Sequence, residues 1–147
     1  MSERDTASTT GIRRILVLCT GNSARSQMAE GLLRHDVGEG VDVASAGTDP
    51  SHVRSEAIAV LREIGIDISA HRSKPVDEFQ GQAFDDVVTV CSAADARCPV
   101  FAGPARRHFR DFADPAAVIG SAEERLAAFR SIRDELRFWL AVEFAAP

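Results

Sequence analysis

Short, continuous apolar runs alternate along the chain with segments whose apolar residues recur at helical spacing. The first run, Arg13–Cys19, reads R-R-I-L-V-L-C and is typical of a parallel strand buried on both faces. The predicted strands are Arg13–Cys19, Val41–Ala46, Val87–Val90 and Arg107–Phe112. The predicted helices that precede the C-terminal region are Gln27–Arg34, Ser55–Ile64 with Gly65 as its C-cap, and the short Ser92–Arg97, which Pro99 stops.

The last segment carries the clearest helical pattern. Ser121 as the N-cap and Glu124 three residues later form the capping-box arrangement. Apolar residues then recur at helical spacing, and they are Leu126, Phe129, Ile132, Leu136 and Leu140. A long C-terminal helix with one apolar face is therefore predicted.

The order of these elements predicts an α/β fold. Strands that alternate with helices favour a three-layer arrangement, with a four-stranded parallel sheet and helices on both faces. A length of 147 residues suits one domain, so residues 12–147 are expected to form it, and the small, polar residues 1–11 a flexible tail. Ligands of open α/β sheets collect at the carboxyl ends of strands, and Cys19 and Cys91 each lie at such an end.

Composition narrows the function classes. A hydrophobic fraction of 45% with 27% charged residues is typical of a soluble globular protein, and a net charge of −5 argues against nucleic acid as a partner. No apolar run reaches the ~18 residues of a membrane span, and no signal-peptide core follows Met1, so a cytoplasmic protein is expected. Three cysteines, an odd number, disfavour a disulfide scaffold and favour a reactive, redox or metal role.

The segment Cys19–Ser26, C-T-G-N-S-A-R-S, has the composition of an anion-binding loop between a strand and a helix. Gly21 permits a tight backbone, Asn22 tolerates a left-handed conformation, and Arg25 can direct two N–H groups at a tetrahedral oxyanion. The positive field favours a thiolate at Cys19, which a hydrogen bond from Ser26 would further favour. The predicted oxyanion-binding residues are Thr20, Gly21, Asn22, Ser23, Ala24 and Arg25.

The cysteine–arginine spacing by itself is weak evidence. Cys91 and Arg97 have the same spacing, but that segment lacks glycine and carries Asp95, whose carboxylate would repel an anion. Context therefore favours the Cys19 loop. The alternative is a buried strand-end cysteine at Cys19 and a surface arginine at Arg25.

At V-L-C-T-G-N-S-A-R-S-Q-M-A-E the chain resembles the thioredoxin-coupled arsenate reductases, which share the fold of low-molecular-weight protein tyrosine phosphatases. The similarity begins in Ile15–Leu33 and covers most of the chain as far as the last helix. Its further segments are Ala44–Thr48, Gly65–Ser69, Val87–Cys91, Cys98-Pro99 and Asp114-Pro115. The pair of Cys91 and Cys98 indicates the reductase branch.

The resemblance implies a role for each thiol. Cys19 would attack the arsenic of bound arsenate, and Asp114 would protonate the leaving hydroxide. Cys91 would attack the Cys19 sulfur and release arsenite, and Cys98 would move the disulfide to Cys91–Cys98. Thioredoxin would reduce that disulfide with electrons from NADPH through thioredoxin reductase, so no bound cofactor is expected, and phosphate or sulfate would compete with arsenate. The cysteines are seven positions apart, roughly 10 Å along an intact helix, whereas a disulfide needs about 7 Å between Cα atoms, so the segment must change conformation.

Two Asp-Pro pairs compete for the general-acid role. Asp49-Pro50 follows the second predicted strand in a turn-like context, which favours a plain turn. Asp114 takes the role by its position in the family, although its own context also suits a turn. Tyrosine phosphatases of this fold usually have an aromatic residue after the Asp-Pro; this chain has Ala116 and no tyrosine, and only Phe109 or Phe112 would substitute.

Loop support is a further expectation from the resemblance. Some reductases of the family resemble this chain at Asn22, Glu30 and Ser45 and bind potassium with the help of an aspartate. The matching residue here is Lys74, the only lysine, and its ammonium is expected to replace the ion through Glu30. The alternative is a solvated surface lysine.

Three functions remain open at this point. The first is arsenate reduction by a monomer that uses all three thiols and no metal. The second is hydrolysis of phosphate monoesters by Cys19, Arg25 and Asp114. The third is a thiol sensor or a metal site built from the three cysteines, although the chain lacks a CxxC spacing, and its four histidines show no metal-binding pattern.

Overall fold

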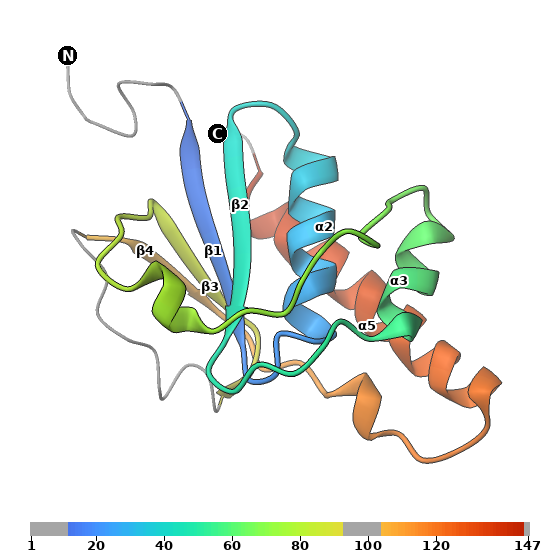
Figure 1. The fold of residues 1–147 in the computed structure, drawn as a ribbon. Coiled ribbons are helices and arrows are strands. Elements are labelled where there is room, and N and C mark those ends of the chain that lie inside the picture. The colour runs from blue at the N-terminus through green and yellow to red at the C-terminus, as the bar shows by residue number, and fades with distance from the viewer. Residues whose placement is uncertain (1–11, 93–103, 146–147) are drawn as a thin grey trace.

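A computed structural model describes residues 12–92 and 104–145, which form an α/β fold around one parallel sheet (Figure 1). The strands are β1 (Arg13–Cys19), β2 (Val41–Gly47), β3 (Asp86–Thr89) and β4 (Arg106–Phe109). The helices are α2 (Arg25–Val37), α3 (Ser55–Arg62) and α5 (Ala122–Glu143), with short 3₁₀ helices η1 (Val76–Phe79) and η2 (Pro115–Ala117). The expected four-stranded parallel sheet is confirmed.

The strand order is β2-β1-β3-β4, and every described pairing is parallel. β1 lies in the interior of the sheet, and Ile15 to Leu18 are completely buried, which explains their continuous apolar run. From β1, the chain adds β2 toward one edge of the sheet and then β3 and β4 toward the opposite edge. The carboxyl ends of β1 and β3 therefore flank the point where the strand order reverses.

The described α-helices pack against one another, because α2 contacts both α3 and α5, and α3 contacts α5. In Figure 1 they gather on one side of the sheet, and η1 lies on the other. This arrangement matches the predicted three layers, although the second face carries only a short helix among the described residues. The long C-terminal helix begins at the predicted capping box, in which the Ser121 hydroxyl accepts from the Glu124 N–H and the Glu124 carboxylate accepts from the Ser121 N–H.

Most element boundaries differ by one to three residues from the sequence prediction; α2 and β2, for example, are longer than the predicted Gln27–Arg34 and Val41–Ala46. α3 ends at Arg62, two residues before the predicted end, because the chain turns through Gly65 at a φ of +83°. β4 ends at Phe109, but the backbone N–H groups of Arg110 and Phe112 still donate to β3 and the residue after it. The predicted helix Ser92–Arg97 follows β3, and only its first residue, Ser92, is described. The rest of this helix lies outside the described residues, as do Cys98, Pro99 and the tail 1–11. The described helices include none long and apolar enough to cross a membrane.

A buried ionic cluster joins the sheet to the C-terminus of α5. The carboxylate of Asp86, 1% exposed, accepts two hydrogen bonds from the Arg13 guanidinium and lies 2.8 Å from His108 Nε2. The other ring nitrogen of His108 lies 2.7 Å from Glu143 in α5. Burial raises the pKa of Asp86, but the hydrogen bonds from Arg13 and His108 outweigh it, so this pKa lies below its ordinary value. The cluster therefore links β1, β3, β4 and α5 through one carboxylate.

Replacing Asp86 by asparagine is expected to lower the free energy of unfolding at pH 7 by about 2 kcal/mol, because charge-assisted hydrogen bonds to two partners are lost. The folded-state pKa of Asp86 is depressed, so its contribution is complete above the ordinary value of 3.8 and is lost as the pH falls below it. Urea unfolding of both proteins between pH 7 and pH 3 measures this difference. The exposed Asp42→Asn is the control, expected to change stability by less than about 0.5 kcal/mol; equal effects of the two substitutions would contradict the structural role.

Candidate active site

The carboxyl ends of β1 and β3 bring Cys19 and Cys91 to the same edge of the sheet. Leu18 pairs with Thr89, and the Val90 N–H donates to the Leu18 carbonyl, so Cys91 follows directly beside the loop that Cys19 begins. Both cysteines are free thiols and are buried, at 1% and 4% exposed. The site thus lies where the strand order reverses, the usual place for a ligand in this architecture.

The Cys19 loop is held from outside by the segment that follows β2. Three backbone carbonyls of the loop accept hydrogen bonds from residues of that segment. The bonds run from Asp49 to Thr20 (2.8 Å), from Ser51 to Gly21 (3.0 Å) and from Arg54 to Ser23 (2.9 Å). Because these carbonyls turn outward, the loop N–H groups turn toward its centre, which is the arrangement of an anion nest.

Helix α2 adds its N-terminus to this loop. Within the described chain, no side chain caps α2 and its first turn contains no acidic residue. The first N–H groups of a helix have no intrahelical partner, and the helix dipole makes this end positive. The loop and helix together therefore form an anion site from backbone groups.

The loop borders a cavity of about 260 Å³. The cavity is lined by the loop, by the segment that follows β2 through Asp49, Ser51 and Arg54, and by Asp114. Besides the predicted nucleophile Cys19, the predicted oxyanion residues that line it are Thr20, Gly21, Ser23, Ala24 and Arg25. The structure therefore brings together the nucleophile, the arginine and the acid that the sequence predicted. Asn22 is the exception, because its side chain is completely buried beneath the loop.

Asn22 fixes the loop from below. It is the one described residue other than glycine with a positive φ, at 47°, as the sequence predicted for this position. Its Oδ1 accepts from the backbone N–H of Lys74 (3.0 Å), which can only donate, so its Nδ2 must face Ser26 (2.8 Å) and Ser45 (2.9 Å). The Ser26 hydroxyl, which accepts from Asn22, lies 2.8 Å from the Cys19 sulfur. Ser26 is thus oriented to donate its proton to a thiolate.

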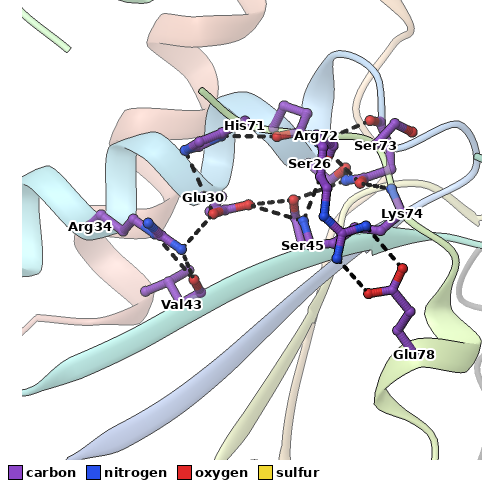
Figure 2. Close-up of polar contacts among 12 residues, drawn as sticks. Ser26, Glu30, Arg34, Val43, Ser45, His71, Arg72, Ser73, Lys74 and Glu78 are labelled. Carbon is purple, nitrogen blue, oxygen red and sulfur yellow. Dashed lines mark hydrogen bonds and ion pairs between the residues drawn. The ribbon is translucent and has the colours of Figure 1, made fainter. Parts of the chain in front are cut away.

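Glu30 is the acceptor at the other end of this chain of hydrogen bonds. Ser45 donates to Glu30 Oε1 at 2.6 Å, and Arg34 lies 2.8 Å from Oε2 (Figure 2). Lys74 Nζ lies 4.0 Å from Oε1 with its side chain 12% exposed, so the alternative of a solvated surface lysine is wrong. The predicted loop-support residues Asn22, Glu30, Ser45 and Lys74 thus form one connected cluster.

Burial affects the pKa of two side chains that lie beside Glu30, those of Lys74 and His71. Burial lowers the pKa of Lys74 below its ordinary value of 10.5, with Glu30 acting in the opposite direction. Burial likewise lowers the pKa of His71, whose Nδ1 lies 3.0 Å from Gln27 Oε1. Gln27 Nε2 donates to Asn22 and to the Arg72 carbonyl, so Gln27 Oε1 accepts from the Nδ1–H of His71.

The second thiol, that of Cys91, contacts the loop at Thr20, the residue after Cys19. Cys91 Sγ lies 3.3 Å from Thr20 Oγ1. The threonine hydroxyl can donate to a sulfur that carries negative charge. Thr20 therefore lies between the two thiols, adjacent to Cys19 in sequence and in contact with Cys91 in space.

The two Asp-Pro aspartates both line the cavity. Asp114 is 45% exposed, N-caps η2 by accepting from the Ala116 N–H, and lies 3.9 Å from Arg25. It occupies both a turn and the cavity edge, so its two sequence interpretations are compatible. Arg25 also donates to the Phe112 carbonyl at 2.8 Å, which holds it against the loop that carries Asp114. Asp49 follows β2 in the expected non-helical segment, and its place beside the cavity was not predicted.

Two residues of the site were not predicted from the sequence: Arg54, which lines the cavity, and Gln27, which donates to both Asn22 and the Arg72 carbonyl. The position of Gln27, directly after the Cys19 loop, was the one sequence feature that could have indicated its role. No sequence feature indicated a role for Arg54. Neither Phe109 nor Phe112 is among the described lining residues; Phe112 is buried against Trp139. Within residues 12–92 and 104–145, no three His, Cys, Asp or Glu side chains are grouped as metal ligands.

Gly47 allows β2 to pass directly under the loop. A Cβ at Gly47 would lie 2.5 Å from the Thr20 carbonyl oxygen and 2.9 Å from the Asn22 nitrogen, and neither backbone atom can rotate away. Gly47→Ala is therefore expected to displace the loop and weaken binding of inorganic phosphate about tenfold or more, measured by titration calorimetry. Gly38→Ala, strained by a φ of +77° at the far end of α2, is the control that loses about 1 kcal/mol of stability but binds phosphate normally. Normal binding by Gly47→Ala would contradict this account of the loop.

Comparisons with known proteins identify the family of the chain. Residues 14–138 match the family described as low molecular weight phosphotyrosine protein phosphatase. The arsenate reductase of Halalkalibacterium halodurans is 44% identical over 122 residues, which cover 83% of this chain and 88% of that protein. The arsenate reductase of Staphylococcus aureus is 40% identical over 131 residues, which cover 89% and 94%.

Solved structures show the same relationship. An arsenate reductase in the phosphate binding state has a TM-score of 0.74 and 29% sequence identity, covering 91% of this chain and 98% of that one. A thioredoxin-dependent arsenate reductase of Corynebacterium glutamicum has a TM-score of 0.63 and 25% identity, covering 95% of this chain and 68% of that one. The chain therefore belongs to the low molecular weight phosphotyrosine protein phosphatase family, in the branch that contains arsenate reductases.

Proposed function

We propose that this protein reduces arsenate to arsenite with its three cysteine thiols. The observation that carries the proposal is the placement of a second thiol, Cys91, against Thr20 of the anion loop, 3.3 Å from its hydroxyl. A phosphatase needs only the first thiol, whereas a reductase needs a second one within reach of it. Relatives of 40% to 44% identity that carry the name arsenate reductase support the same conclusion.

In the first step the cavity binds arsenate as a tetrahedral oxyanion, held by the loop N–H groups and by Arg25. The Cys19 thiolate, hydrogen-bonded by Ser26, attacks arsenic(V) and forms an S–As bond. Asp114, beside the cavity and within 3.9 Å of Arg25, gives its proton to the departing hydroxide, which leaves as water. Phosphate and sulfate share the tetrahedral shape and compete for the same donors.

In the second step the Cys91 thiolate attacks the Cys19 sulfur. The S–As bond breaks, its electron pair stays on arsenic, and arsenic(III) leaves as arsenite. Two thiols are oxidised to the Cys19–Cys91 disulfide, which accounts for the two electrons that arsenic gains. The hydroxyl of Thr20 stabilises the attacking Cys91 thiolate through the contact already present.

Cys98 completes the cycle. Its thiolate attacks Cys91, releases the Cys19 thiolate and forms the Cys91–Cys98 disulfide. Cys98 lies outside the described residues, and the conformational change expected between Cys91 and Cys98 stays a prediction. Thioredoxin then reduces this disulfide, with electrons from NADPH through thioredoxin reductase. A reducing cytoplasm, a monomeric enzyme and no bound cofactor are consistent with this cycle.

Phosphomonoester hydrolysis is the second candidate, because Cys19, Arg25 and Asp114 line one cavity and the family takes its name from phosphatases. An aryl phosphate would need an apolar wall for its ring. The position after Asp114-Pro115 is Ala116, and the lining of the cavity is polar among the described residues. The site therefore favours inorganic oxyanions, with ester hydrolysis as a residual activity.

The relay is tested with arsenate, thioredoxin, thioredoxin reductase and NADPH. Cys91→Ser is expected to abolish steady-state NADPH consumption, and Cys98→Ser to stop after one turnover, because neither variant can form the final disulfide. Hydrolysis of p-nitrophenyl phosphate, which needs neither thiol, should persist in both variants and disappear in Cys19→Ser. NADPH consumption by Cys91→Ser at the rate of the unaltered protein would overturn the relay. Absence of arsenate-dependent NADPH consumption by the unaltered protein, with p-nitrophenyl phosphate still hydrolysed, would replace the reductase by a phosphatase.

We also propose that Lys74 supports the loop in place of a bound potassium ion, through its ion pair with Glu30 and its hydrogen bond to the Arg72 carbonyl at 3.3 Å. The unaltered protein is expected to reduce arsenate equally fast in potassium and sodium chloride. Lys74→Gln should lower turnover several-fold, and potassium should partly restore it, because the cavity that the ammonium leaves borders the Glu30 carboxylate. Arg62→Gln has the same charge change on the exposed end of α3 and serves as control. Several-fold stimulation of the unaltered protein by potassium would refute this role.

A further inference from the structure

Arg54 is a second guanidinium at the cavity, and the mechanism above does not use it. It lines the cavity together with Cys19 and Arg25. Its backbone N–H donates to the Ser23 carbonyl at 2.9 Å, so the residue is attached to the anion loop itself. As the N-cap residue of α3, it also has its carbonyl engaged by the Ile58 N–H. The position of its Cα relative to the loop is therefore fixed from both sides.

One atom of the Arg54 side chain, Nε, lacks the hydrogen-bond partner that its burial requires. Its Nε is buried, and no described residue accepts a hydrogen bond from it. Buried guanidinium N–H groups almost always donate to an acceptor, because leaving one unsatisfied costs free energy. The nearby carboxylate Glu56 does not fill this role, since it accepts instead from Arg125 at 3.1 Å. No acceptor remains among the described residues, and a ligand in the cavity that Arg54 lines can supply one.

Charge in the cavity leads to the same conclusion. With Asp114 protonated as the general acid, a Cys19 thiolate and a bound arsenate or phosphate bring at least two negative charges beside the carboxylate of Asp49. Arg25 is partly engaged by the Phe112 carbonyl and by Asp114, so its charge alone leaves a large excess of negative charge. A second cation reduces the repulsion between the thiolate and the anion that it must attack.

We infer that Arg54 binds the oxyanion directly, as a second arginine that donates to oxygens not held by Arg25 and the loop. This inference rests on the proposed function, since it takes the cavity to be the oxyanion site. It makes the site selective for dianions over monoanions, because each additional negative charge on the ligand interacts with two guanidinium groups rather than one. Small inorganic oxyanions, whose four oxygens are all accessible, gain most from a second donor fork.

The test uses inorganic phosphate as a non-reducible probe, titrated by calorimetry into the reduced full-length protein. Arg54→Gln is expected to raise the dissociation constant for phosphate about tenfold or more. Arg54→Lys keeps the charge but loses the paired N–H donors of the guanidinium, so its dissociation constant should lie between those of the unaltered protein and Arg54→Gln. Arg62→Gln removes an equal charge from the exposed C-terminal end of the same helix and is expected to bind phosphate normally. The loss in Arg54→Gln should shrink between pH 8 and pH 6, because phosphate becomes a monoanion.

Arsenate kinetics give a second readout. Arg54→Gln should raise KM about as much as it weakens phosphate binding and change kcat less, whereas general damage to the fold would lower kcat and stability together. Phosphate binding by Arg54→Gln equal to that of Arg62→Gln would overturn the inference. Since phosphate binding needs no turnover, a protein that binds phosphate through Arg54 but forms no arsenite would keep this inference and lose the proposed function.

Discussion

The site depends on one buried amide. Asn22 adopts a left-handed backbone conformation, and its side chain bonds Ser26, Ser45 and the Lys74 N–H at the same time. These bonds have a fixed direction because each end of the chain of hydrogen bonds can act in only one way: the Lys74 N–H donates and the Glu30 carboxylate accepts. The direction passes through Ser26 to the Cys19 sulfur. Lys74 and Glu30, both distant from Cys19 in sequence, therefore set the direction in which Ser26 can donate to a Cys19 thiolate. Glycine has no side chain to form this network, and an aspartate carboxylate could not donate to Ser26 and Ser45.

The strand order explains why several chain segments meet at this amide. β1 lies between β2 and β3, so the loop that begins at Cys19 is bordered by the ends of both strands. The segment after β2 turns the loop carbonyls outward, and Gly47 lets that strand approach within contact of the loop backbone. The other neighbour, β3, delivers Cys91 to Thr20. One parallel sheet therefore supplies both the anion site and the second thiol, and neither needs an additional domain.

The sequence predicted correctly those features that depend on interactions between residues close together in the chain. The apolar run of β1, the capping box of α5 and the glycine–asparagine loop each depend on neighbouring residues, and all three are present where they were expected. Strand ends were less predictable, because β4 continues to donate to Val90 after its regular pairing ends. Arg54 gave no sequence signal, since its role arises only when a segment about thirty positions from Cys19 folds over the loop. The proximity of Lys74 to Glu30 could be predicted only from the family resemblance, because these residues are also far apart in sequence.

Members of this family share the anion loop, so the rest of the cavity lining must distinguish between their substrates. A loop of backbone N–H groups with one arginine binds any tetrahedral oxyanion, so it does not by itself separate an ester from an inorganic ion. Discrimination comes from what surrounds the fourth oxygen. In this chain the described surroundings are Asp49, Ser51, Arg54 and Asp114, all polar, while the nearby Phe112 packs inward on Trp139. An aryl group would leave these charged side chains desolvated and unpaired, whereas a fourth oxygen can accept from them. The polarity of this rim, together with the thiol at Cys91, accounts for a phosphatase fold that acts on an inorganic oxyanion.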